Sequence, residues 1–325
     1  MPDHSTWWRK RIPAPVQLTT GPLQFRDPFP SKDGRKVFVV GSQTRAELVR
    51  YDAQSGEFVP YLGGISAGDA DFSRDGQWVT YVSYPDRTLW RSRVDGSERL
   101  ELTYPPMETL LPHWSPDGQQ IAFMGRAPGK PWKIFLVPRD GGRVQGITSD
   151  QLAETDPAWS SDGKTLAFSR STHPEDESSR IGLLNLETRQ ISQLRGSEQI
   201  CCPRWSPDGR YIIALTAPVQ RLVLYDVRND KWKHFDTKQA FQGSYLAWSH
   251  DSAYVHCDCI IGGEARYCRL RIRDGKLEPL FDFKKLPRRF QVLADSWLGL
   301  GPGDTPLFVR DTSTQEIYAL DVEFP

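Results

Sequence analysis

The sequence is poor in the residues and patterns that mark metal-bound, membrane-spanning or nucleic-acid-binding chains. Its 325 residues include only five cysteines and six histidines, and Lys plus Arg equals Asp plus Glu at 41 each. This balance excludes a strong overall field that would attract nucleic acid or an anionic membrane. No apolar run approaches the 18 residues of a membrane-spanning helix, and the first residues lack the apolar core of a secretion signal. We therefore expect no membrane span and no nucleic-acid partner, and the compartment stays open.

Long stretches with the 3.6-residue apolar spacing of a helix are also missing. The sequence instead repeats one turn, Trp-Ser-Pro-Asp-Gly, at residues 114–118 and again at 205–209. Five looser copies bring the total to seven, and the last positions of the copies are Gly34, Gly76, Gly118, Gly163, Gly209, Ser252 and Asp304. The steps between them are 42, 42, 45, 46, 43 and 52 residues. A period in this range is typical of a repeat architecture.

Each repeat has the pattern of four short strands. Proline presets φ in the turn, and aspartate and glycine suit its later positions. An aromatic residue ends the strand before the turn, and alternating apolar runs such as 120–124 and 132–137 follow it. Four antiparallel strands per period of this length are typical of a propeller blade. The sequence thus predicts an all-β fold, a seven-bladed β-propeller of four-stranded antiparallel blades.

The two ends of the chain predict how the ring closes. The last repeat offers only three strands, at 294–300, 306–310 and 316–322, whereas residues 15–20 resemble the fourth strand of other blades. We predict that this N-terminal strand completes the last blade, which would remove an exposed sheet edge. Residues 1–14 fit no blade and are predicted to be an arm or linker, with the propeller over 15–325. We expect a monomer.

Two sequence features resemble catalytic or metal-binding motifs. Residues 64–68 match G-x-S-x-G, but a nucleophile elbow needs a strand before the serine and a helix after it, so we expect an inter-blade loop. On a strand, Cys257 and Cys259 share one face while His256 points to the other. This spacing also differs from the paired knuckles of structural zinc sites. Buried thiols are the first expectation; a bridge from Cys268 to Cys259 or Cys257, or a metal site, stays open.

The residues just before each aromatic anchor are predicted to line one mouth of the central channel. Three residues before the anchor lie Asp27, Asp69, Leu111, Asp156, Cys202, Tyr245 and Trp297. Directly before it lie Phe29, Asp71, His113, Ala158, Arg204, Ala247 and Gly299. The predicted ligand-binding residues are the charged and imidazole members of both columns: Asp27, Asp69, Asp71, His113, Asp156 and Arg204.

Converging carboxylates at this mouth could hold a cation, and His113 with Arg204 could meet an anionic group. The alternative is that the aspartates only cap loops and accept bonds from backbone amides. One histidine in the ring argues against a catalytic centre with several histidine ligands. We expect no catalytic residue, metal or cofactor.

The repeat resembles a known family. The motifs Asp-x-x-Trp-Ser-x-Asp-Gly at 156–163 and Pro-x-Trp-Ser-Pro-Asp-Gly at 112–118 are similar to the TolB-type propeller repeat of TolB, tricorn-like proteins and the prolyl oligopeptidase and dipeptidyl peptidase families. The resemblance covers essentially residues 15–325. Residues 307–321 resemble the end of bacterial sensor proteins, in which such a propeller follows a winged-helix or Ser/Thr-kinase domain. TolB has six blades and an extra α/β domain, so this chain departs from it. The peptidase triad lies in a hydrolase domain, and no catalytic residue transfers.

The functional expectation is a non-catalytic binding or scaffold propeller of a bacterial signalling or envelope system, periplasmic or cytoplasmic. It would take a protein partner or a small ligand at one propeller face. The alternative is a metal-dependent carbohydrate-active lyase or hydrolase with its site at the propeller mouth. The resemblance specifies the repeat and the fold far more closely than the function.

Overall fold

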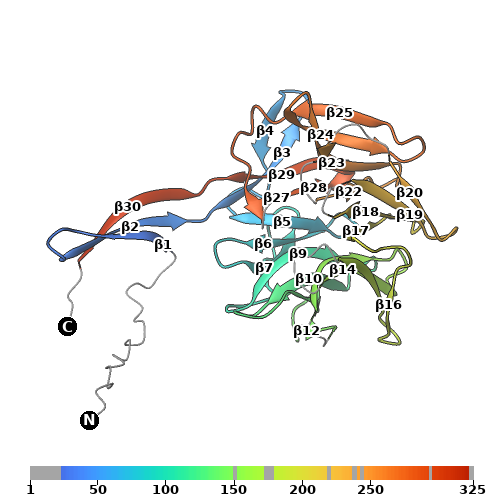
Figure 1. Ribbon diagram of the computed structural model, residues 1–325, viewed down its shortest axis with the longest axis horizontal. Coiled ribbons are helices and arrows are strands. Elements are labelled where there is room, and N and C mark those ends of the chain that lie inside the picture. Colours follow the sequence, from blue (N-terminus) through green and yellow to red (C-terminus); the bar gives the residue numbers. More distant parts are fainter. Residues whose placement is uncertain are drawn as a thin grey trace, which may run out of the picture. The chain divides into compact units, whose positions relative to one another are not determined.

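The computed structural model describes residues 23–148, 152–171, 179–217, 221–235, 240–241, 245–292 and 295–321 (Figure 1). Regular structure in these residues is β-strand except for one 3-10 turn, η1 (Pro302–Asp304). The chain divides into two compact units, a larger one over Thr44–Ser313 and a smaller one that joins residues 1–43 to 314–325. No helix within the described ranges is long and apolar enough to cross a membrane.

The larger unit is built from antiparallel sheets that follow the predicted repeat. Four of them consist of strands consecutive in sequence. They are β5 (Ala67–Phe72), β6 (Trp78–Ser83), β7 (Thr88–Arg93) and β8 (Leu100–Glu101); β9 (Glu108–Trp114), β10 (Gln120–Arg126), β11 (Lys133–Pro138) and β12 (Gln145–Gly146); β13 (Ala153–Trp159), β14 (Thr165–Ser171), β15 (Arg180–Asn185) and β16 (Ile191–Gln193); and β17 (Ile200–Trp205), β18 (Tyr211–Thr216), β19 (Leu222–Asp226) and β20 (Lys231–His234).

Two further sheets of this unit are less regular. The fifth has five strands: β21 (Ala240–Phe241), β22 (Ala247–Trp248), β23 (Tyr254–Ile261), β24 (Glu264–Arg271) and β25 (Leu277–Asp282). The sixth combines both ends of the unit: β28 (Leu298–Gly301), β29 (Thr305–Asp311), β3 (Ala46–Asp52) and β4 (Glu57–Pro60). A two-stranded ribbon, β26 (Gln291–Val292) with β27 (Asp295–Ser296), precedes β28.

These six sheets follow one another around a ring. The innermost strands β5, β9, β13 and β17 contact each other in that order, and β22, β28 and β5 continue the series. The remaining step, from β17 to β22, is bridged by the Trp248 indole, which donates to the Arg204 carbonyl at 2.9 Å. Large side chains such as Phe123, Phe168 and Phe308 are fully buried in these sheets, so the core is distributed around the ring.

The smaller unit holds the seventh sheet. It consists of β1 (Gln24–Pro30), β2 (Lys36–Gln43) and β30 (Thr314–Asp321), which are blue and red in Figure 1 because they come from opposite ends of the sequence. The described residues therefore contain seven antiparallel sheets of three or more strands, the number of predicted turns. This arrangement confirms the all-β propeller, with six sheets in the ring of the larger unit and one in the smaller unit.

Strands from opposite ends of the chain close the ring, as predicted, but the third strand of the last sheet is not the predicted one. The last sheet of the ring is completed by β3 and β4, with β29 paired to β3 from Ala46↔Asp311 to Arg50↔Leu307. β30, predicted as the third strand of that sheet, pairs with β2 instead. Burial explains the preference for β3, because its Leu48 and Val49 are 1% and 0% exposed. Residues 15–20, and the predicted arm at 1–14, lie outside the described residues.

Candidate functional site

The repeated turn is held by its own serine and aspartate. Ser115 Oγ donates to Asp117 Oδ1 at 2.6 Å, and Oδ1 also accepts the Gln119 amide at 3.0 Å. Gly118 closes the turn with φ at 68°, in the left-handed region that glycine favours. The same serine–aspartate bond recurs in the turns that begin at Ser31, Ser73, Ser160, Ser206 and Ser249. It is the main reason that the pKa values of Asp33, Asp75, Asp162 and Asp251 are lowered.

The anchor tryptophans join neighbouring sheets. The indole N–H of Trp114 donates to the Asp71 carbonyl of the preceding sheet at 3.2 Å, and that of Trp159 donates to the His113 carbonyl at 3.0 Å. Trp248 holds the Arg204 carbonyl in the same way. Trp205 departs from the pattern and donates to Gly209 of its own turn at 3.1 Å. The residues before the anchors are thus fixed through their backbone by the next sheet.

A bulge sits in the innermost strand at the first predicted column. Asp69, Leu111, Asp156 and Cys202 have φ values of 48°, 49°, 57° and 58°, and the strand registers shift at the same places. Positive φ is uncommon outside glycine, and bulges redirect side chains. Residues three positions before the anchor therefore face differently from those directly before it.

One cavity of about 750 Å³ opens at the end of the innermost strands. Its lining combines strand residues with the turns that follow them. The residues in these strands or just before them include Asp71, His113, Ala158, Arg204, Tyr245, Ala247, Trp297 and Gly299, and the turn residues include Arg74, Asp75, Pro116, Ser161, Pro207, His250, Asp251 and Asp304. All of them belong to the larger unit.

Three of the six predicted ligand-binding residues meet at this cavity: Asp71, His113 and Arg204. Asp71 Oδ2 accepts the Trp114 amide at 2.7 Å and lies 3.7 Å from His113 Nδ1. These two side chains are about one-third and one-quarter exposed. They can therefore offer both a hydrogen-bond donor and acceptors to a bound group.

Asp156 supports the cavity from behind. Arg204 Nη2 donates to Asp156 Oδ1 at 3.1 Å, and Arg204 Nη1 donates to the Pro203 carbonyl at 2.8 Å. The two side chains are only 9% and 13% exposed. The charge of Arg204 is thus compensated, which weakens the expectation that it attracts an anion together with His113.

The other two predicted residues do not line the cavity. Asp69 is 1% exposed, and burial raises its pKa to about 7, although the Leu111 backbone and the charge of Arg87 act in the opposite direction. Asp27 belongs to the smaller unit, where its side chain is 73% exposed and lies 3.8 Å from Arg26 Nε. The sequence columns therefore do not bring six polar groups to one point.

Sequence reasoning missed the polar residues of the turns themselves. Arg74, His250, Asp251 and Asp304 line the cavity, and Asp304 Oδ1 accepts the His250 amide at 2.9 Å. Their signal was the repeat itself, because a turn that follows the innermost strand must lie at the same end of the channel. The seventh copy of the turn, which ends at Asp304, differs so much from the others that its place at the cavity was not recognised.

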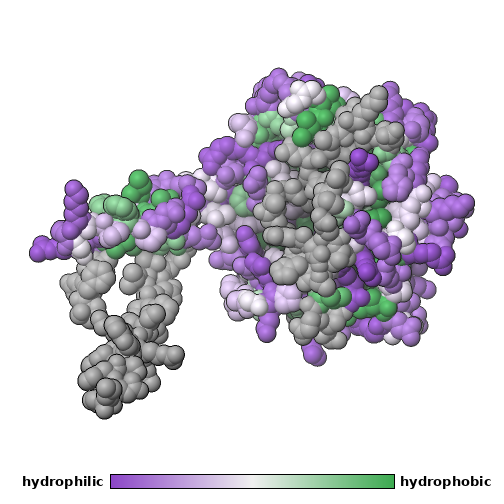
Figure 2. Space-filling model, viewed as in Figure 1, coloured by the Kyte–Doolittle hydropathy of each residue, from purple (hydrophilic) through white to green (hydrophobic). Residues whose placement is uncertain are grey.

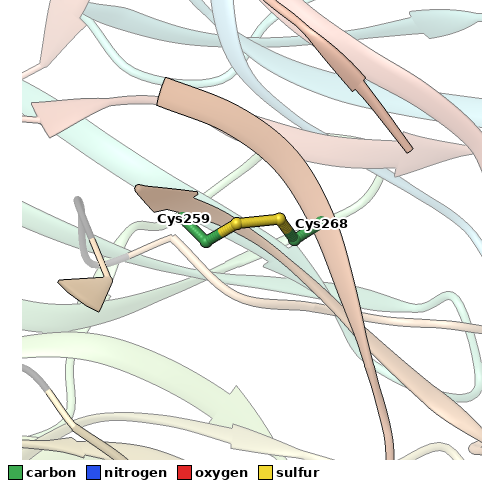
Figure 3. The surroundings of a disulfide bond; sticks show 2 residues. All are labelled: Cys259 and Cys268. Atoms are coloured by element: carbon green, nitrogen blue, oxygen red, sulfur yellow. A yellow bond between two sulfur atoms is a disulfide. The ribbon is translucent and has the colours of Figure 1, made fainter. Parts of the chain in front are cut away.

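The two motifs singled out in the sequence have structural explanations. Ser66 leads into β5 rather than a helix, and its Oγ accepts the Ala46 amide at 3.1 Å, as expected for an inter-sheet loop. Cys259 and Cys268 form a disulfide between β23 and β24, which is the bridge left open above (Figure 3). Cys257 is a buried free thiol, and burial raises its pKa. No group of three or more His, Cys, Asp or Glu within the described residues is arranged to hold a metal.

His256 is a core residue rather than a ligand-facing one. It is 6% exposed, and its Nδ1 lies 2.7 Å from the Tyr267 hydroxyl. Burial lowers its pKa to about 4, so the ring is neutral at pH 7. The neighbouring disulfide and this pairing together account for the cysteine–histidine cluster of the sequence.

Comparison with known proteins agrees with the fold. The family model of the TolB beta propeller domain matches residues 27–252. An uncharacterized protein of Agrobacterium fabrum is 28% identical over 156 residues, 43% of this chain and 53% of the relative, so the chain spans about half of that relative's length.

Two solved structures share the fold. One, a protein of Agrobacterium tumefaciens assigned as TolB, aligns at a TM-score of 0.66 and 19% identity over 83% of this chain and 99% of the other. The other is an oligogalacturonate lyase in complex with manganese, which aligns at 0.53 and 15% identity over 78% and 76%.

Proposed function

The chain belongs to the TolB beta propeller family, and from that premise we propose that it is a non-catalytic binding module that receives a segment of a protein partner at the cavity of the larger unit. Such a module fits a bacterial signalling or envelope assembly. The observation that carries the proposal is that polar groups at the cavity form pairs of a hydrogen-bond donor and an acceptor. Asp71 lies beside His113, and Arg204 is bonded to Asp156.

A lining with both donors and acceptors favours a particular kind of ligand. Four aspartates (Asp71, Asp75, Asp251 and Asp304) and two arginines (Arg74 and Arg204) line the cavity, so the lining has no excess of positive charge for a strongly anionic ligand. A peptide backbone carries one donor and one acceptor per residue and can use both members of each pair. The cavity volume of about 750 Å³ lies within the usual range of about 300–1,000 Å³ for binding pockets.

The serines of the lining support binding rather than acyl transfer. Ser73, Ser115 and Ser206 each donate their hydroxyl to the aspartate of their own turn, at 2.5–2.6 Å. A nucleophilic serine needs its hydroxyl hydrogen-bonded to a general base such as histidine. These hydroxyls instead stabilise the turns that rim the cavity.

The test is capture of partners by immobilised protein, with identification by mass spectrometry. Two lining variants, His113→Ala and Arg74→Glu, change the cavity without removing a buried charge pair. The matched control is Arg228→Ala, an exposed residue of the same unit that does not line the cavity. A partner bound by the wild type and the control, but lost by both lining variants, supports the proposal. Retention of every partner by both lining variants contradicts it.

The alternative function, a metal-dependent carbohydrate-active lyase or hydrolase, has a direct test. The fold is shared with an oligogalacturonate lyase that binds manganese. Purified protein is incubated with oligogalacturonate with and without manganese, and unsaturated product is followed by absorbance. Manganese-dependent turnover that is lost in His113→Ala would replace the binding proposal with an enzymatic one.

A further inference from the structure

The sheet of the smaller unit has two different faces. On one face, the pairings Phe29↔Phe38↔Ala319 and Val40↔Ile317 place five apolar side chains together, and we call these five residues the open face. Residues directly opposite each other in antiparallel strands lie on the same side of the sheet. Phe29, Phe38 and Ile317 are 71%, 39% and 78% exposed.

The opposite face is covered by its own aromatic rings. Phe25 and Tyr318 meet edge to face with centroids 5.7 Å apart. A Cβ on Gly41 would lie 2.5 Å from the Tyr318 ring and 3.1 Å from the Phe25 ring, so this glycine allows the rings to close over the strand. Val39 on this side is 6% exposed. Figure 2 shows hydrophobic atoms gathered on the smaller unit, over the strands labelled β1, β2 and β30 in Figure 1.

The repeat shows what the open face is built to contact. In each sheet of the ring, the position equivalent to Phe38 is the second-strand partner of the residue before the anchor. These equivalents are Thr80, Ala122, Ala167, Ile213, His256 and Leu307. All six are between 0% and 6% exposed. Six sheets of the repeat bury this position, and the seventh leaves it 39% exposed.

We propose that the open face is an interface between two copies of this chain, in which the smaller units pack sheet against sheet. The six equivalent positions in the ring are already buried, so among the described residues they offer no uncovered face of this repeat. The same sheet of a second copy does offer one. Two sheets of one kind packed face to face form a two-layered sandwich with interdigitating side chains. A two-fold axis would make the contact self-complementary.

The charges at the rim of the open face suit a contact with an identical surface. Lys36 Nζ lies 2.7 Å from Asp321 Oδ1, and Arg26 Nε lies 3.8 Å from Asp27 Oδ2. Each of these two cations therefore has an anion within its own sheet, and the described residues of the smaller unit carry four basic and four acidic side chains. A second copy would meet apolar side chains at the centre and neutral pairs at the edge, as in other self-associating interfaces. The expectation from the sequence was a monomer, and this proposal departs from it.

The experiment measures the mass of the full chain in solution by light scattering over a range of concentrations. The wild type is expected to dimerise, and Ile317→Glu and Phe29→Glu are expected to be monomers with unchanged circular dichroism. Both residues are more than two-thirds exposed, so their replacement removes little packing within one copy. The matched control, Val227→Glu, changes an exposed apolar residue of the larger unit and is expected to leave the dimer intact.

Two results would overturn the proposal. One is a wild type that stays monomeric at every concentration, which would mean that the face has no copy of itself as a partner. The other is a dimer that persists in both Ile317→Glu and Phe29→Glu, which would assign the contact to another surface. Neither result depends on whether the cavity of the larger unit binds a protein segment.

Discussion

The sheets of the ring and the sheet of the smaller unit are built from the same repeat, and they differ in what covers them. Both have the serine–aspartate turn, with Ser115 bonded to Asp117 in one and Ser31 bonded to Asp33 in the other, each at 2.6 Å. Both have the bulge before the anchor, with φ at 53° for Asp27 and 48° for Asp69. Local sequence therefore sets the shape of each sheet, whereas neighbouring sheets set the burial and the energetics of its side chains.

The largest expected difference concerns phenylalanines of the two regions. Phe308 in β29 is 1% exposed and contacts the rings of Phe58, Tyr267 and Phe283. Phe308→Ala should lower the free energy of unfolding by about 3–5 kcal/mol, because it leaves a cavity in a packed core. Phe29→Ala, at a position 71% exposed, should change it by about 0.5 kcal/mol or less at protein concentrations where the chain is monomeric. Urea unfolding of both variants measures the difference, and equal losses would break the comparison.

The second difference is the effect on stability of two aspartates three residues before their anchors, Asp69 in the ring and Asp27 in the smaller unit, and it depends on pH. Asp69 has a folded-state pKa of about 7, against about 3.9 in the unfolded chain. Because folding favours its protonated form, Asp69 costs nothing below pH 4, and its cost grows as pH rises to 7. Asp69→Asn should therefore raise stability by up to about 4 kcal/mol at pH 8 and by little at pH 4.

Asp27→Asn is the matched control for this pH effect, since Asp27 is exposed. Thermal unfolding of both variants at pH 4 and pH 8 gives the answer. A stability gain for Asp69→Asn that is the same at both pH values would show that burial of the charge is not its cause.

The smallest difference concerns the turn serines. Ser115 is 3% exposed, and its hydroxyl donates to Asp117 and accepts the Gln120 amide. Ser115→Ala should cost about 1–2 kcal/mol, because it leaves a partly buried amide without its partner. Ser31→Ala removes the same bonds at a more exposed turn, where water can replace them, and should cost about 0.5 kcal/mol. Chemical denaturation resolves the two, and a larger loss for Ser31→Ala would contradict the role of burial.

The sequence predicted local structure well because the turn is a local signal. Gly118 and its equivalents have the left-handed φ that the motif requires, and the strands lie on both sides of each turn. The meeting of Asp71, His113 and Arg204 at one cavity could also be predicted, because equivalent positions of a repeat lie at equivalent places.

Long-range pairing could not be predicted in the same way. Two residues separate β2 from β3, and two separate β29 from β30, and all four strands contain consecutive apolar residues. Local pattern alone does not tell which of them pair, because the contacts join opposite ends of the chain. The burial of Asp69 was hidden for another reason. Its side-chain direction depends on the positive φ of a bulge. Aspartate tolerates this conformation, but its presence alone does not predict it.

The indole bonds between neighbouring sheets have a consequence for which cavity residues can change. The indoles of Trp114, Trp159 and Trp248 hold the preceding sheets through main-chain oxygens alone. A substitution at His113 leaves that oxygen in place, so a cavity residue can change while the indole bond between the sheets stays. Side chains at such positions can therefore be exchanged in an engineered protein without redesign of the bonds between the sheets.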